Sequence, residues 1–131
     1  MIKKVLIANR GEITCRIIET AQRMGVSCVA VHSDVDAGAR HVVLADQAVS
    51  LGGATPAESY LRGDALIAAA RDSGAQAIHP GYGFLSEREE FPRVLEKNGI
   101  TFIGPNPAAI AAMGAFSVAA MQAKPGGISL T

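Results

Sequence analysis

Short apolar runs alternate along the chain with longer segments in which apolar residues recur every three or four positions. The runs are rich in Val, Ile and Ala and carry few charges, which is typical of strands that are covered on both faces of a parallel sheet. The longer segments have the period of amphipathic helices. The pattern predicts five strands, at residues 3–8, 26–32, 47–51, 75–78 and 100–103.

The periodic segments predict the helices that connect these strands. The first helix is expected to end before Gly25, because glycine favours the conformation that closes a helix. Its buried face is predicted from residues at helical spacing, namely Ile13, Ile17, Ile18, Ala21 and Met24. In all, helices are predicted at residues 12–24, 39–46, 64–73 and 90–98.

The last of these helices follows a predicted single turn. Ser86 and Glu89 match a capping box, but a helix starting there would place Pro92 in its interior, at a cost of about 3 kcal/mol. We therefore expect one turn at 86–89 and a separate helix with Pro92 in its first turn. The apolar face of that helix is predicted to consist of Phe91, Val94 and Leu95.

Because strands and helices alternate, the chain is predicted to be α/β: a Rossmann-like three-layer domain with a mostly parallel five-stranded sheet. After the fifth strand, a short helix is predicted at Pro107–Met113, closed by Gly114. Periodicity fades beyond this point. We expect one domain over residues 1–114 and a divergent, partly ordered tail over 115–131.

Composition and charge narrow the possible functions. Lys+Arg and Asp+Glu balance at 12 each, which argues against general nucleic-acid binding and against a polybasic membrane surface. No apolar run approaches the roughly 18 residues of a membrane span, and the N-terminal run is too short for a signal peptide. A cytoplasmic protein is therefore expected. The turn Asn9-Arg10-Gly11-Glu12 lacks the glycine fingerprint of NAD-binding proteins.

The cysteines and one acidic pair have structural interpretations. Cys15 lies in a predicted helix and Cys28 in a predicted strand, so both are expected to be buried free thiols. Asp34 and Asp36 lie in a polar loop without a calcium-loop pattern, and they are interpreted as turn formers rather than metal ligands.

The stretch from His79 to Glu87 is a loop of unusual composition. It follows a buried strand, contains one proline and two glycines, and yet carries Tyr82, Phe84 and Leu85. One interpretation is a turn whose aromatic side chains plug the core. The other is a shaped ligand-binding loop, since ligands bind at the carboxyl ends of strands in open α/β sheets.

The order of residues in this loop resembles the signature loop of the biotin carboxylase N-terminal domain. The resemblance extends over about residues 2–114. Its motifs are Ile7-Ala8-Asn9-Arg10-Gly11-Glu12-Ile13, Ala30-Val31-His32-Ser33, His41-Val42-Val43-Leu44-Ala45-Asp46, Glu58-Ser59-Tyr60-Leu61, His79-Pro80-Gly81-Tyr82-Gly83-Phe84-Leu85-Ser86-Glu87 and Phe102-Ile103-Gly104-Pro105.

The resemblance implies a part in an enzyme that uses ATP and bicarbonate to carboxylate biotin on a biotin carboxyl carrier protein. Tyr82 and Gly83 would form one wall of the biotin site, and His79, Gly81 and Glu87 would order the loop. No catalytic residue and no metal ligand is expected in this chain. By the family pattern Arg16 would contact a second subunit, so a homo-oligomer is expected. From the residues alone, His79 is a packed histidine more often than a base, and Arg16 could be an ordinary solvated residue.

The sequence departs from the family pattern after Gly114. The family has a lysine that contacts ATP at the position of Phe116, and a helix and a long ATP-grasp module then follow in the family. Biotin, ATP and magnesium are therefore expected in the parent enzyme, with none bound tightly by this chain, which should be inactive alone. Apolar surface that the ATP-grasp remainder would cover is expected to promote self-association, with Ile110, Met113, Phe116 and Met121 as candidates. The alternative is a non-catalytic Rossmann-like module that binds a ligand or partner.

Overall fold

The computed structural model describes residues 2–104 of the chain, except for the side chain of Glu87. The predicted helix Pro107–Met113, the tail at 115–131 and Phe116 lie outside the described residues. So do the apolar side chains proposed for self-association.

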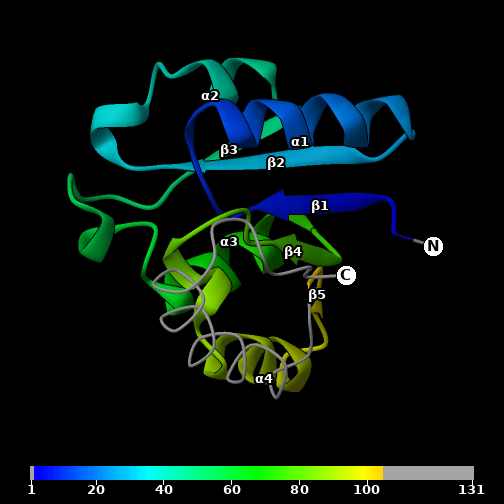
Figure 1. Cartoon of the computed structure of the whole chain (residues 1–131), viewed down its shortest axis with the longest axis vertical. Helices are drawn as coiled ribbons and strands as arrows, with labels where there is room; N and C mark the ends of the chain where they lie inside the picture. The colour runs from blue at the N-terminus through cyan, green and yellow to red at the C-terminus, as the bar shows by residue number, and fades with distance from the viewer. Residues whose placement is uncertain (1, 105–131) are drawn as a thin grey trace, which may run out of the picture.

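Five parallel strands form one sheet in the order β3-β2-β1-β4-β5 (Figure 1). Every described strand pair is parallel, so the predicted α/β fold with a five-stranded sheet is confirmed, and the sheet is wholly parallel. The chain order reverses at β1, which pairs with both β2 and β4. The strands are β1 (Lys4–Ile7), β2 (Ser27–His32), β3 (Gln47–Ser50), β4 (Ala77–His79) and β5 (Thr101–Phe102).

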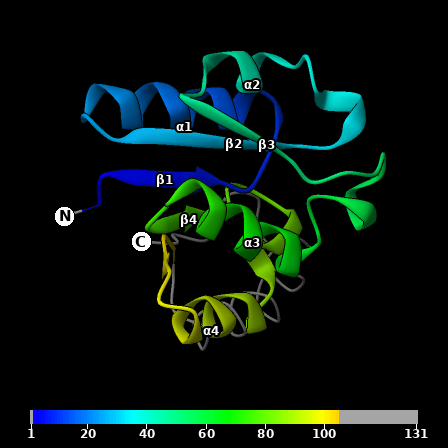
Figure 2. The same cartoon turned by 180° about the vertical axis from the view of Figure 1, so that it is seen from behind.

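Helices cover the sheet from both sides and form the three predicted layers. One face carries α1 and α2, and the other carries α3 and α4, as the two opposite views show (Figures 1 and 2). The helices are α1 (Gly11–Arg23), α2 (Arg40–Leu44), α3 (Gly63–Ser73) and α4 (Glu90–Lys97). Single 3₁₀ turns occupy Asp34–Asp36, Pro56–Glu58 and Phe84–Glu87. Within residues 2–104, none of these helices is long and apolar enough to cross a bilayer.

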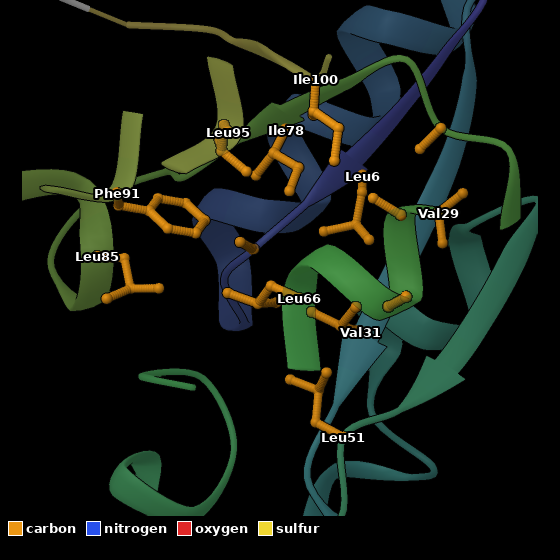
Figure 3. Close-up of a cluster of buried hydrophobic side chains, with 14 of the residues drawn as sticks. Leu6, Val29, Val31, Leu51, Leu66, Ile78, Leu85, Phe91, Leu95 and Ile100 are labelled. Atoms are coloured by element: carbon orange, nitrogen blue, oxygen red, sulfur yellow. The ribbon is translucent and has the colours of Figure 1, made fainter. Parts of the chain in front are cut away.

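The core divides into two clusters because successive side chains of a strand point to opposite faces of the sheet. Leu6 points toward α3 and α4, where it meets Leu66, Ile78 and Leu95 (Figure 3). Its neighbours Val5 and Ile7 belong to the cluster beneath α1, with Ile18. Leu6, Ile18, Leu66 and Leu95 are fully buried, and burying such a side chain contributes about 1.5–3 kcal/mol.

The predicted buried face of α1 is correct at Ile18 and wrong at Met24. The helix buries Thr14, Cys15 and Ile18 against the sheet, whereas Met24 is 74% exposed. The prediction assumed that all apolar residues at helical spacing are equally buried. In the structure Ile18 is fully buried, whereas Ile17 and Ala21 are only partly buried and lie at the margin of the buried face.

Two further predictions need correction near α4. The 3₁₀ turn starts at Phe84 rather than Ser86, because Gly83 and Phe84 both have positive φ and reverse the chain two residues early. The predicted capping box is therefore not formed at this turn. Helix α4 begins at Glu90 with Pro92 in its first turn, as expected, but Val94 is 40% exposed.

Candidate functional site

The signature loop lies at the carboxyl edge of the sheet, beside the turn that follows β1. Strands β1 and β4 are parallel neighbours, and the Ala8 amide donates a 2.8 Å hydrogen bond to the carbonyl of His79. The residues after each strand therefore meet at one edge, close to the point where the strand order reverses. Ligands bind at such a point in open α/β sheets.

Asn9 fixes the start of the loop, residues 79–81, which we call the first flank. Its side chain is 3% exposed, and its Nδ2 atom donates to the carbonyls of Pro80, at 2.9 Å, and Tyr82. Its Oδ1 atom accepts the Arg10 amide at 2.8 Å. A polar side chain directly after a fully apolar strand is the sequence feature that points to this role, and Asn9 was not among the predicted site residues.

Gly81 is packed directly against Asn9. Its φ is +66°, and a Cβ atom added there would lie 2.7 Å from Nδ2 and 2.9 Å from Cβ of Asn9. A side chain at this position would therefore be strained and would displace the asparagine. The Asn9 contact thus depends on glycine at position 81.

His79 is half-buried and accepts the Gly81 amide on Nδ1 at 3.1 Å. An accepting Nδ1 places the proton of the neutral ring on Nε2. Burial lowers the pKa of His79 and favours this neutral form. This arrangement is that of a packed, hydrogen-bonded histidine rather than of a base.

The aromatic and apolar residues of the loop divide between the two interpretations of the sequence. Leu85 is buried and Phe84 is half-buried against the core, as in a turn that plugs the core. Tyr82 is 72% exposed, as in a ligand-binding loop. Gly83 has φ +65° and ψ −158°, and a Cβ atom there would meet no atom within 4 Å. We call Tyr82–Gly83 the crown of the loop.

A partly buried ionic network lies behind residues 84–86, which we call the second flank of the loop. Arg10 binds both oxygens of Asp36, with Nε–Oδ2 at 2.6 Å and Nη2–Oδ1 at 2.9 Å, and the Tyr60 hydroxyl donates to Oδ2 at 2.6 Å. The hydrogen bonds from Arg10 hold the pKa of Asp36 well below its usual range. Burial raises the pKa of Tyr60 to about 12. Asp36 does lie in a turn, as predicted. It is also only 7% exposed and binds Arg10 and Tyr60, which the prediction of a simple turn former did not include.

Arg16 lies on the exposed side of α1. Its side chain is 75% exposed and forms a 3.7 Å ion pair with Glu12, which occupies the first turn of the helix. Such a pair on the helix surface is worth only a few tenths of a kcal/mol. The arginine is thus available for a contact outside the described residues.

Arg16 also borders an open groove of about 900 Å³ along the inner side of α1. The exposed Met24 lies in this groove, which Ile17 and Ala21 also line from the margin of the buried face of α1. Lys3 and Arg16 are its charged lining residues. Its apolar lining consists of Ile2, Val5, Ile17, Ala21, Met24, Val26 and Ile103.

The remaining polar chemistry of the described residues is limited. Between residues 2 and 104, no three His, Cys, Asp or Glu side chains are grouped so as to hold a metal ion. Cys15 and Cys28 are both buried and free, as predicted. Burial raises the pKa of the Cys28 thiol to about 11, so it is protonated at neutral pH and unreactive.

Curated relatives match most of this chain but are much longer. The propionyl-CoA carboxylase alpha chain of Caenorhabditis elegans is 60% identical over 111 residues, which are 85% of this chain and 15% of the relative. The propionyl-CoA carboxylase alpha chain of Ruegeria pomeroyi is 54% identical over 114 residues, 87% of this chain and 17% of the relative. The chain therefore spans about 15% of the length of these relatives.

Solved structures agree with the sequence matches. The urea carboxylase of Kluyveromyces lactis superposes with a TM-score of 0.84 at 51% identity, over 86% of this chain and 10% of that one. The biotin carboxylase domain dimer of Hydrogenobacter thermophilus 2-oxoglutarate carboxylase, in complex with MgADP, ADP and bicarbonate, gives 0.82 at 47% identity over 93% of this chain and 27% of that one. The family model described as "Biotin carboxylase, N-terminal domain" matches residues 1–110. The chain therefore belongs to the biotin carboxylase N-terminal domain family, as the signature loop predicts.

Proposed function

We propose that this chain works as the N-terminal part of an enzyme that uses ATP and bicarbonate to carboxylate biotin on a biotin carboxyl carrier protein. The observation that carries the proposal is the exposed crown, held at the carboxyl edge of the sheet between two buried flanks. Family membership and the carboxylase relatives support the same reaction.

In this proposal the crown forms one wall of the biotin site. The exposed ring of Tyr82 offers a flat apolar face and a hydroxyl to the bicyclic ring of biotin. Gly83, which has open space where a side chain would be, lets the ligand approach its backbone closely. His79 and Gly81 would order the loop through the hydrogen bond between them, and Glu87 is proposed for the same role from the family pattern. The role of the wall is to orient biotin, and we propose no proton transfer through these residues.

The described residues do not fit the phosphates of ATP. Arg10, the cation in the turn after β1, is already bound to both oxygens of Asp36. Glu12 places a carboxylate in the first turn of α1, where a phosphate would otherwise be favoured. We therefore assign ATP and magnesium to the rest of the parent enzyme and derive no step through them here.

The open groove beside α1 supports a contact with the remainder of the parent. An apolar groove of this size on an isolated domain is typical of a surface that another domain covers. Lys3 and Arg16 at its border would favour a partner segment that carries carboxylates. Arg16 is also the residue for which the family pattern implies a subunit contact.

A chimera tests the proposed function. Residues 1–114 of this chain replace the corresponding segment of the Ruegeria pomeroyi relative, which is 54% identical to the chain. We expect the chimera to hydrolyse ATP in a biotin-dependent manner, and the 131-residue chain alone to show neither this activity nor micromolar binding of MgATP. A soluble, folded chimera without activity, beside an active unmodified relative, would instead favour a non-catalytic binding module.

A further inference from the structure

The second flank of the signature loop holds a bulky residue in a strained conformation. Phe84 has φ +49°, in the left-handed region that large side chains rarely adopt. Its ring stacks on Tyr60, with ring centroids 5.2 Å apart and an angle of 19° between the planes. Because such backbone strain persists only where the surroundings enforce it, the face of Tyr60 is the surface that holds Phe84 in place.

Tyr60 is itself fixed from behind. Its side chain is buried, its hydroxyl donates to Asp36 at 2.6 Å, and the Ser33 amide donates to the same hydroxyl at 3.4 Å. Asp36 in turn is held by both hydrogen bonds from Arg10. The orientation of the tyrosine ring is therefore fixed by a carboxylate that is 24 residues away in sequence.

Both flanks of the loop lead back to the same turn. Asn9 binds the carbonyls on the first flank directly, and Arg10, the next residue, reaches the second flank through Asp36 and Tyr60. The crown lies between the two flanks and faces outward. The turn after β1 thus acts as a common anchor for the loop.

We propose that Asp36 and Tyr60 are positioning residues for the crown. They set the direction in which Tyr82 and Gly83 face by fixing Phe84, and they contact no ligand themselves. The functional meaning of this inference rests on the proposed biotin site. The contact chain from Asp36 through Tyr60 to Phe84, which we call the clamp, is a property of this chain and is measured on it directly.

Amide hydrogen exchange of the 131-residue chain measures the clamp. The Ser86 amide donates to the Gly83 carbonyl at 2.9 Å and reports opening of the second flank. Tyr60→Leu removes the stacked ring and should speed exchange of the Ser86 amide about tenfold. Tyr60→Phe keeps the ring but loses the hydrogen bond to Asp36, so it should speed exchange measurably but less than Tyr60→Leu does. Asp36→Asn should speed exchange in the wild-type background but add little to Tyr60→Phe, because the same link is already broken.

The matched control is Ile18→Val, which removes one methylene from the cluster on the opposite face of the sheet. It lowers global stability and should leave Ser86 exchange unchanged when exchange is measured under native conditions. Equal Ser86 exchange in Tyr60→Leu and Ile18→Val would overturn the proposal, as would equal effects of Asp36→Asn in the wild-type and Tyr60→Phe backgrounds. If the chimera is active but Ser86 exchange does not change in the variants, only the positioning role of Asp36 and Tyr60 is refuted. If the chimera is inactive but the exchange pattern is as predicted, only the proposed biotin site is refuted.

Discussion

Gly81→Ala should destabilise the chain by more than the ordinary cost of a left-handed alanine. The φ of +66° carries a penalty of about 1–2 kcal/mol for any residue with a Cβ atom. The added methyl would also lie 2.7 Å from Nδ2 and 2.9 Å from Cβ of Asn9, and the second atom cannot move without the backbone. Displacing Asn9 puts at risk two hydrogen bonds to the loop, each worth about 1 kcal/mol. We expect a total loss of about 2–4 kcal/mol.

Urea denaturation followed by circular dichroism measures this loss, and the fold supplies a matched control. Gly74 closes α3 with φ +76°, and a Cβ atom there would meet no atom within 4 Å. Gly74→Ala therefore carries the backbone penalty without the contact, and the difference between the two variants isolates the contact with Asn9. If Gly81→Ala costs no more than Gly74→Ala, the close packing of the loop on Asn9 is refuted.

Three further outcomes are expected. The lowered pKa of Asp36 means that its pairing stabilises the fold fully above about pH 4, the unfolded value, and that this stability is lost as pH falls further. The stability difference between wild type and Asp36→Asn should therefore shrink on acidification below pH 4 in urea titrations, and a difference that grows would contradict this. Cys28, with its pKa raised to about 11, should resist a thiol reagent at pH 8 until urea unfolds the chain. Fast labelling of native Cys28 would show that the strand opens locally. The chain should self-associate through the groove in sedimentation experiments, and Ala21→Glu in the groove should weaken association whereas Val43→Glu on exposed α2 should not. A wild-type monomer at high concentration would remove the basis for this expectation.

The central strands and their parallel pairing could be predicted because β1, β2 and β4 are mostly buried, and such strands read as apolar runs. The register of α1 could not be predicted in the same way. Spacing alone does not distinguish residues that face the sheet, such as Ile18, from residues such as Ile17 that line an open groove. Both kinds of residue have the same apolar character in the sequence, and only the fold separates them.

The loop was recognisable from the order of its residues, but most of what holds it was not. Tyr60 and Asp36 lie about 20 and 40 residues before the loop in sequence, and only the fold brings them together behind Phe84. Turn propensity treats Asp34 and Asp36 alike, yet only Asp36 is buried and paired with Arg10, whose side chain is half exposed. The capping-box prediction failed for a related reason. A local match at Ser86 was overridden by the positive φ values of Gly83 and Phe84, which start the turn two residues earlier.

The kinetics of biotin in the chimera test the central claim most directly. The claim is that the crown orients biotin from one side while the rest of the enzyme handles ATP. Tyr82→Ala should raise the KM for biotin about tenfold, with the KM for ATP unchanged, and Tyr82→Phe should recover most of the loss if the ring face provides the contact. An unchanged KM for biotin in Tyr82→Ala, or an equal rise in both KM values, would contradict the assignment of the crown as the wall of the biotin site.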